Sequence, residues 1–238
     1  MIGKLWREVT FMVAFGATPR IILRYLLDLP HRRRAARKLP EAEQEADGLS
    51  LSRNWIGTHG THWKRVLDRV GLHEEGDWRI LEIGSFEGRS AVHFLRTFPR
   101  AHLTCVDPWQ PYAGIPDYTA QHEARFDANT APYADRLRKF KGASQRFFVE
   151  EAREEIYDIV YVDGDHSVNG AMVDMIGATS RLKDGGVLLL DDYFLLEKKE
   201  GTRPTAAAVN AFIRMHGPEI KILFVGYTVI LQKMALRS

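Results

Sequence analysis

Short apolar runs alternate with segments of helical periodicity from residue 78 to residue 215. Five runs are predicted as β-strands, at 78–83, 102–106, 138–141, 156–162 and 186–190, with helices between them at positions such as 89–97 and a further helix at 205–215. This alternation is typical of a parallel sheet with helices on both faces. Two later runs, 221–225 and 227–231, flank Gly226 and predict a hairpin. We therefore expect an α/β fold, a doubly wound, mostly parallel, seven-stranded sheet with a C-terminal antiparallel hairpin.

The first 53 residues follow a different pattern. Apolar and basic residues are interspersed over 1–38, which predicts a basic amphipathic helical arm, and the acid-rich stretch 39–53 is predicted to be a linker. The domain proper is expected at 54–238. Its first helix is predicted to be capped by Thr61, to end at Gly71 and to place an i, i+3, i+4, i+7 stripe in the core. The stripe consists of Trp63, Val66, Leu67 and Val70.

Positive charge is concentrated in the arm. The chain has a net charge of +2, but residues 1–40 hold nine Lys and Arg against two acids, a net +7 that leaves −5 for the rest. One interpretation places the arm at a membrane interface, with Trp6, Phe11 and Phe15 among anionic headgroups. The other packs the arm on the domain or on a second subunit of a homo-oligomer. The sequence leaves both open.

The predicted arm and the composition of the chain disfavour several classes of protein. Pro19 and charged residues keep the apolar runs shorter than the about 18 residues of a membrane span, and the short run 9–17 behind Glu8 does not suit a signal peptide. The single cysteine, Cys105, excludes a disulfide framework and suits a reducing compartment. Nucleic acid is not an expected partner, because no recognition motif accompanies the charge. We expect a cytoplasmic protein, with the inner face of a membrane as the open alternative.

The segment 80–90, ILEIGSFEGRS, predicts a buried strand that breaks into a glycine turn and opens a helix. Gly84 and Gly88 allow close approach of a ligand to the backbone, and the first helical amides can face a carboxylate or phosphate. Dinucleotide folds use G-x-G-x-x-G, whereas this chain has E-x-G-x-x-x-G, which favours S-adenosylmethionine over NAD. Glu82 could accept from the ammonium group of that cofactor, and Ser90 could donate to its carboxylate. An ordinary βα turn is the alternative.

Two later segments offer further cofactor contacts. Asp107 ends the second predicted strand, where an acid commonly binds the hydroxyls of a ribose. Ser144 and Gln145 open a helix and could bond the edge of an adenine, although a plain helix cap by Ser144 is equally compatible. Between these segments, residues 110–135 predict an irregular lid that continues into a helix ending near Arg138. Its aromatic residues, with Trp109, could stack on a substrate ring; they are Tyr112, Tyr118 and Phe126.

Acidic residues follow the fourth and fifth predicted strands. They are Asp163 and Asp165, with His166 beside them, and Asp191 and Asp192. Parallel strands end at one edge of a sheet, so these side chains are expected to converge. Several carboxylates in a partly dry crevice either take up protons or hold a cation, and an all-oxygen set suits Mg²⁺. His59 and His62 lack a third ligand nearby, so a structural or substrate-lining role is favoured for them over metal binding.

Five motifs in order, EIGSFEGRS, VD at the second strand, GASQ, VDGDHS and LDDY, resemble those of class I S-adenosylmethionine-dependent methyltransferases. The resemblance is to the metal-dependent O-methyltransferases, such as catechol O-methyltransferase and the bacterial sugar and macrolide-sugar O-methyltransferases, and spans about residues 55–232. It implies a Rossmann-like methyltransferase fold.

The resemblance also implies roles for single residues. It places Glu82, Gly84 and Ser90, with Ser85, Phe86 and Gly88 in the same turn, on the methionine end of the cofactor, Asp107 on the ribose, and Ser144 and Gln145 near adenine. Asp163, Asp191 and Asp192 fall where the family binds its metal, Asp163 also bordering the cofactor. Catechol enzymes have Asp-Asn where this chain has two aspartates, and their lysine base has no counterpart here. Asp165 is the preferred base, with His166 second.

The expected activity is therefore transfer of a methyl group from S-adenosylmethionine to a hydroxyl of a small molecule or glycan, assisted by Mg²⁺. Two alternatives stay open. One is a different reaction on the same fold, such as N-methylation or the hydroxylase-type role of some relatives. The other is a non-catalytic module that binds cofactor or a partner and is tethered to membrane by the arm. No motif identifies the acceptor.

Overall fold

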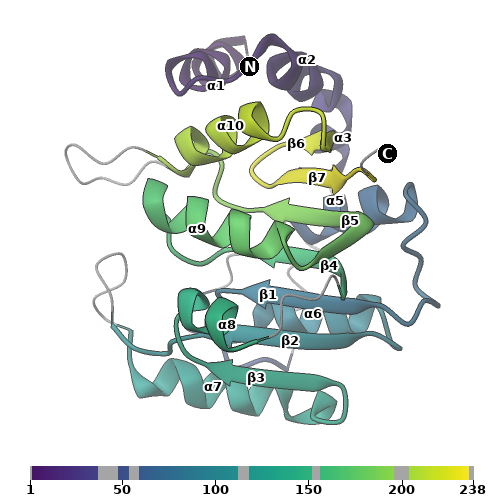
Figure 1. Cartoon of the computed structure of the whole chain (residues 1–238), viewed down its shortest axis with the longest axis vertical. Coiled ribbons are helices and arrows are strands. Elements are labelled where there is room, and N and C mark those ends of the chain that lie inside the picture. The colour runs from purple at the N-terminus through teal and green to yellow at the C-terminus, as the bar shows by residue number, and fades with distance from the viewer. Residues whose placement is uncertain are drawn as a thin grey trace.

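The centre of the molecule is a seven-stranded sheet with the strand order β3-β2-β1-β4-β5-β7-β6 (Figure 1). The computed structural model describes residues 2–36, 48–53, 59–111, 118–151, 156–195 and 204–235. The strands are β1 (Arg79–Ile83), β2 (His102–Asp107), β3 (Leu137–Lys141), β4 (Tyr157–Val162), β5 (Leu182–Leu190), β6 (Ile220–Val225) and β7 (Val229–Lys233). The first five are parallel, and β7 pairs antiparallel with β5 and β6. The predicted fold class is confirmed.

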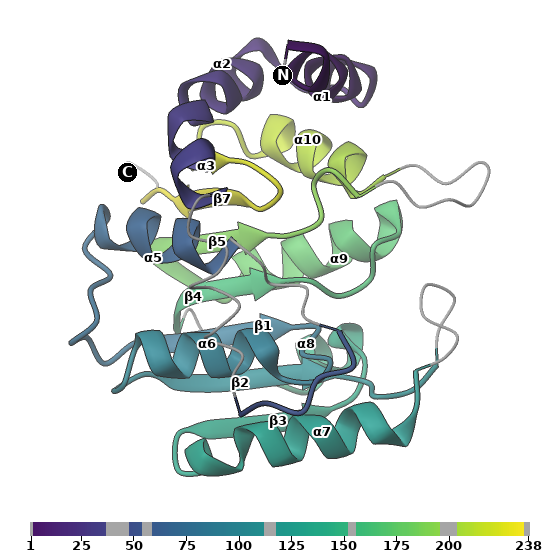
Figure 2. The same ribbon diagram turned by 180° about the vertical axis from the view of Figure 1, so that it is seen from behind.

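Helices cover both faces of this sheet. They are α5 (His59–Asp68), α6 (Arg89–Thr97), α7 (Ala120–Thr130), α8 (Ser144–Glu150), α9 (Val168–Thr179) and α10 (Thr205–Met215), with a short 3-10 turn η1 (Ala131–Tyr133). Helices α8, α9 and α10 lie in front of the sheet in Figure 1, and α5 and α6 cover the face seen in Figure 2. Each face has its own apolar core, and alternate strand residues serve the two. In β4, Val160 and Val162 join one core while Ile159 and Tyr161 join the other.

The carboxyl ends of β1, β2, β4 and β5 are joined to one another just beyond the strands. The Gly84 N–H donates to the Val106 carbonyl at 2.9 Å, and the Asp163 N–H donates to the Ile83 carbonyl at 2.8 Å. The Asp191 N–H in turn donates to the Val162 carbonyl at 3.0 Å. The residues that follow these strands are therefore held side by side by the backbone alone.

Several predicted boundaries are wrong. Strand β7 begins at Val229, two residues after the predicted start, and α5 ends at Asp68, before Gly71. Helix α5 begins at His59, before the predicted cap at Thr61, and β5 begins at Leu182, four residues early. The segment predicted as a lid contains α7, which a capping box between Thr119 and His122 starts and which ends at Thr130. Residues 112–117 of that segment, and 39–47 of the predicted linker, lie outside the described residues, as do 54–58.

The N-terminal arm forms α1 (Ile2–Ala14), α2 (Pro19–Leu27) and α3 (Leu29–Ala36), with α1 and α2 side by side beyond α10 (Figures 1 and 2). Asp28 accepts a hydrogen bond from the Val225 N–H at 3.0 Å, and Arg32 donates to the Val225 carbonyl at 2.8 Å. The Asn210 amide donates to the Phe15 carbonyl at 2.9 Å. One face of the arm thus packs on the domain. Within the described part of the chain, no helix is long and apolar enough to cross a membrane.

Candidate functional site

The glycine turn after β1 is closely packed against the end of β4. Gly84 has φ +86°, Phe86 φ 45° and Gly88 φ 80°, so three residues of the turn lie in the left-handed region. A Cβ added to Gly84 would lie 2.1 Å from the Asp163 carbonyl oxygen. Only glycine fits there, both because of its φ and because of this contact. The turn predicted to receive the cofactor therefore adjoins the segment that carries the acids.

Asp107 holds this turn in place. Its carboxylate accepts from the backbone N–H groups of Ser85 and Phe86, each at 3.0 Å, and of Trp109 at 2.7 Å. The Tyr118 hydroxyl donates to it as well, at 2.9 Å. Burial raises the pKa of Asp107, while these hydrogen bonds act in the opposite direction. This structural role was not foreseen from the sequence, and binding of a ribose by Asp107 stays a prediction.

Glu82 is fully buried beneath the same turn. Its Oε2 accepts from Cys105 Sγ at 3.3 Å, and the hydroxyls of Ser90 and Ser85 lie close enough to act against the rise of its pKa. Glu82 Oε1 and Ser85 Oγ are nevertheless buried without a hydrogen bond of good geometry. Burial raises the pKa of Glu82 to about 7. Buried polar atoms are rarely left unsatisfied in proteins, so the two atoms indicate that a polar ligand group belongs here.

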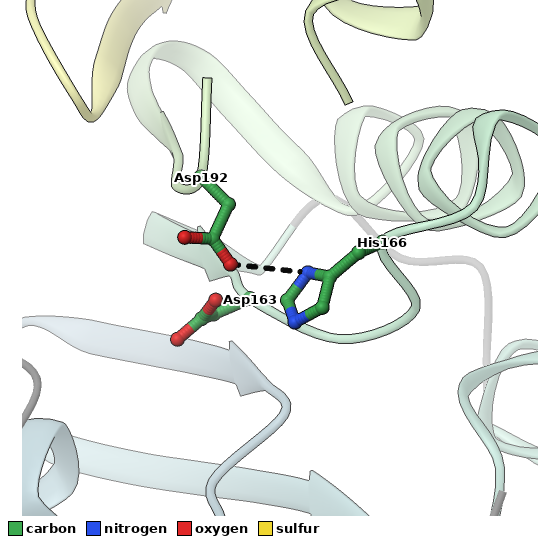
Figure 3. Close-up of side chains that lie close together, drawn as sticks. All are labelled: Asp163, His166 and Asp192. Atoms are coloured by element: carbon green, nitrogen blue, oxygen red, sulfur yellow. Dashed lines mark ion pairs between the residues drawn. The ribbon is translucent and has the colours of Figure 1, made fainter. Parts of the chain in front are cut away.

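The acids beyond β4 and β5 form a compact group with His166 (Figure 3). Among the described residues, ligand atoms of Asp163, His166 and Asp192 all lie within 4.8 Å of one another. His166 Nδ1 is 3.1 Å from Asp192 Oδ2, and its other ring nitrogen points away from Asp192. Burial, and then the negative charges of Asp192 and Asp191, raise the pKa of Asp163 well above its usual range. The group is therefore short of positive charge, as expected of a cation site.

Asp191 lies outside this group, although the sequence predicts it as a metal ligand. Its carboxylate accepts from Thr228 Oγ1 at 2.8 Å and from the Tyr161 hydroxyl at 2.6 Å. The same hydroxyl lies 3.0 Å from Asp163. The Tyr227 side chain hydrogen-bonds to Asp192, and burial and that negative charge raise its pKa. Asp191 therefore occupies a second layer behind the group.

Asp165, the preferred base, also lies outside the group. Its side chain is exposed and accepts from the Ser167 N–H at 2.8 Å, at the start of α9. A Cβ added to Gly170 would overlap the Asp165 carboxyl group, so this side chain is turned onto the first turn of the helix. The structure brings His166, and not Asp165, to Asp163 and Asp192.

The predicted adenine turn is tied to a buried acid that the sequence analysis missed. Ser144 is the first residue of α8, not its cap, and its hydroxyl donates to Asp174 of α9. Asp174 is buried, which raises its pKa to about 6, and it also accepts from the Asp165 N–H. The sequence did carry a signal for this residue, because Asp174 is an acid within the apolar pattern of 168–179. Gln145 is exposed beside this contact.

The aromatic residues proposed to stack on a substrate are core residues instead. Trp109, Tyr118 and Phe126 are each at most 3% exposed. Trp109 packs on Phe126, with ring centroids 4.7 Å apart, and its indole N–H donates to the Phe86 carbonyl. That interpretation of the three residues is wrong, because tertiary packing buries them. Tyr112 lies outside the described residues.

Comparison with known proteins finds a similarity that covers this site. Residues 81–193, which include the turn, Asp107 and the acidic group, match the family model described as a methyltransferase domain. The match covers somewhat less than half of the chain, and it shows that this segment is similar to methyltransferase domains. A mimivirus protein, the uncharacterized protein R132 of Acanthamoeba polyphaga mimivirus, is 22% identical over 144 residues. The match spans 60% of this chain and 64% of that protein, so less than two thirds of the relative is covered.

Solved structures share the fold of this chain. An O-methyltransferase from Bacillus cereus in complex with SAH aligns with a TM-score of 0.55 at 15% identity, over 90% of this chain and 99% of that one. The MycE methyltransferase of the mycinamycin biosynthetic pathway, in complex with Mg, SAH and mycinamycin VI, aligns with a TM-score of 0.52 at 16% identity. That alignment covers 84% of this chain and 54% of MycE. The sheet is that of the Rossmann-like methyltransferase fold.

Proposed function

We propose that this chain transfers a methyl group from S-adenosylmethionine to a hydroxyl oxygen of a small molecule or glycan, with a divalent cation at Asp163 and Asp192. One observation carries the proposal. The glycine turn and the acidic group touch at the contact between Gly84 and the Asp163 carbonyl. A methyl donor held at the turn and an acceptor held at the acids would therefore be neighbours, as an in-line transfer requires.

The turn suits the methionine end of the donor. Its buried acceptor, Glu82 Oε1, and buried donor, Ser85 Oγ, make no hydrogen bond of good geometry within the described structure. The ammonium and carboxylate groups of the donor need an acceptor and a donor, and the first amides of α6 add further donors. S-adenosylmethionine supplies the methyl group already activated on a sulfonium. The protein then has only to hold the donor, exclude water and orient the acceptor.

The acidic group suits a hard cation with oxygen ligands. Asp163 and Asp192 provide carboxylates, and the raised pKa of Asp163, caused by burial and by its acidic neighbours, supports a site that gains from a compensating charge. A bound Mg²⁺ would lower the pKa of a coordinated hydroxyl and orient it. Solved neighbours give two supports: SAH in the Bacillus cereus enzyme, and Mg with SAH in MycE.

His166 is the proposed base in this arrangement. When Nδ1 donates its proton to Asp192, the other nitrogen keeps a free lone pair for the proton of the acceptor hydroxyl. Asp192 then both fixes the imidazole orientation and stabilises the imidazolium. Asp165 is less suited, because its exposed carboxylate is occupied at the start of α9.

Calorimetry with S-adenosylmethionine, with and without Mg²⁺, tests the proposal directly. We expect binding of the donor without metal, binding of Mg²⁺ to the protein, and methyl transfer to a hydroxyl acceptor that EDTA abolishes. Mass analysis of products made with labelled donor distinguishes O-methylation from N-methylation. Binding of NAD in place of S-adenosylmethionine, or full activity in EDTA, would contradict the corresponding part of the proposal.

The affinity for S-adenosylmethionine should depend on the protonation of Glu82. Its pKa of about 7 leaves it largely neutral below that pH, whereas an ammonium group prefers the carboxylate. The dissociation constant should therefore fall about tenfold as pH rises from about 5.5 to 7. Glu82→Gln should bind weakly with a flat profile over this range, while Glu74→Gln, at an exposed acid, should behave as wild type. A steep profile retained in Glu82→Gln would assign the titration to another group.

A further inference from the structure

The arm has a second face that the domain does not cover. Large apolar side chains are exposed along it: Trp6 69%, Val13 59%, Leu23 58%, Leu26 41% and Leu27 61%. They lie on α1 and α2, which form the layer beyond α10 in both views (Figures 1 and 2). The opposite sides of the same helices hold Met12, Ile21 and Tyr25 in the core. Exposed apolar residues that line two adjacent helices indicate an interaction surface.

The exposed charges of the arm have one sign. Between residues 3 and 34, the charged side chains that are exposed are cations, namely Lys4, Arg7, Arg20, Arg33 and Arg34. The two acids of that stretch turn inward. Glu8 is hydrogen-bonded by Tyr25 at 2.5 Å, and Asp28 is buried and bonded to Arg24 and to the Val225 N–H. The inward placement of both acids leaves the surface more basic than the sequence count alone suggests.

Positive charge continues from the arm onto α5. Arg34 of α3, together with Arg65 and Arg69 beyond it in the chain, lies close enough to His31 to lower its pKa, although burial is the larger cause. Burial, and then the charges of Arg69 and Arg34, lower the pKa of Arg65. Guanidinium groups gathered in this way repel one another and favour a polyanionic partner.

We propose that the outer face of α1 and α2 binds the surface of an anionic lipid membrane, with the leucines and Trp6 among the headgroups and the cations on lipid phosphates. An apolar stripe flanked by exposed cations is typical of a helix that lies in the interface between membrane and water. Anionic headgroups provide the negative charge that this face lacks. A second copy of the chain would instead bring like charges together across the interface, which disfavours dimerisation through this face.

Flotation of the full-length protein with vesicles tests this surface. Vesicles of phosphatidylcholine alone are compared with vesicles of phosphatidylcholine and phosphatidylglycerol, at low and at physiological salt. We expect binding to the anionic vesicles only, weakened by salt. Equal binding to both compositions, or no binding to either, would overturn the proposal.

Two double variants separate the contributions. Arg7→Ser with Arg20→Ser should weaken binding to anionic vesicles about 25-fold, at about five-fold for each cation. Trp6→Ser with Leu23→Ser should weaken it at least about tenfold. Val149→Ser, at an 84% exposed position of α8, and Arg100→Ser are matched controls and should bind as wild type.

All of these side chains are exposed, so we expect each variant to be folded, and circular dichroism checks this. Light scattering tests whether a second copy of the chain covers this face instead. A stable dimer that Leu23→Ser dissociates, or vesicle binding unchanged in both double variants, would assign the face to something other than lipid. Retained binding in the controls with lost binding in the double variants supports the proposal.

Discussion

Asp163→Asn is expected to reduce methyl transfer on the order of 1,000-fold, because the charge stabilisation provided at a metal site is worth several kcal/mol. The same change should make the free protein more stable. Burial and its acidic neighbours raise the pKa of Asp163, so stability falls as pH rises from the unfolded-state pKa to the folded-state pKa and stays at the lower level above it. Thermal unfolding at about pH 8 should show a higher midpoint for the variant than for wild type. Added Mg²⁺ should raise the midpoint of wild type and leave that of the variant unchanged.

Asp165→Asn is the matched control, two residues along the same loop. Asparagine can still accept from the Ser167 N–H, and Ser167, which caps α9 through the Gly170 N–H, is unchanged. We expect this variant to bind Mg²⁺ and to retain methyl transfer. Loss of transfer with normal Mg²⁺ binding would make Asp165 the base and exclude His166. Undiminished transfer by Asp163→Asn would refute the metal site itself.

Gly84→Ala is expected to unfold the protein more readily than any other single methyl addition to the site. Two effects destabilise the variant. Alanine is strained at a φ of +86°, and its Cβ would lie 2.1 Å from the Asp163 carbonyl oxygen, a backbone atom that cannot rotate away. Together these cost about 3–5 kcal/mol, a large part of a typical domain stability. The midpoint of thermal unfolding should fall by about 10 °C or more, and calorimetry should detect no S-adenosylmethionine binding.

Gly71→Ala isolates the first of these two costs. Gly71 has φ +88°, almost the same as Gly84, but nothing lies within 4 Å of the added Cβ. Its variant should lose only about 1–2 kcal/mol and should bind the donor normally. Similar losses in the two variants would show that backbone strain alone explains Gly84, and that the contact with Asp163 contributes little.

The sheet was largely predictable because each strand repeats its polarity with period two or is buried on both faces. The runs that became β1, β2 and β4 are followed by the turn, by Asp107 and by Asp163, so the sequence also predicted which residues meet at one edge. Parallel order alone enforces that convergence. Helices 89–97 and 205–215 were predicted with their observed bounds, because their apolar spacing is regular.

The arrangement of the acids was less predictable, because it depends on partners far away in the chain. Asp191 is turned from His166 by Thr228 and by Tyr161, which lie 37 and 30 residues away. No local pattern reports such a contact. Burial of Trp109, Tyr118 and Phe126 has the same origin. An aromatic residue in a segment with proline and glycine looks exposed in sequence, and only its packing in the apolar core on one face of the sheet places it inside.

The turn between β6 and β7 brings two distant parts of the molecule together. Val225 is bonded through its N–H and its carbonyl to Asp28 and Arg32, while Tyr227 is bonded to Asp192, and Gly226 alone separates them. Arg32 and Val225 are 193 residues apart in the chain, yet they are hydrogen-bonded. Only Gly226 then separates Val225 from Tyr227, which is bonded to the acidic group. A truncated protein that lacks the arm would leave both polar groups of Val225 without these partners. Such a shortened chain would not be a fair substitute for the full protein in measurements of the site.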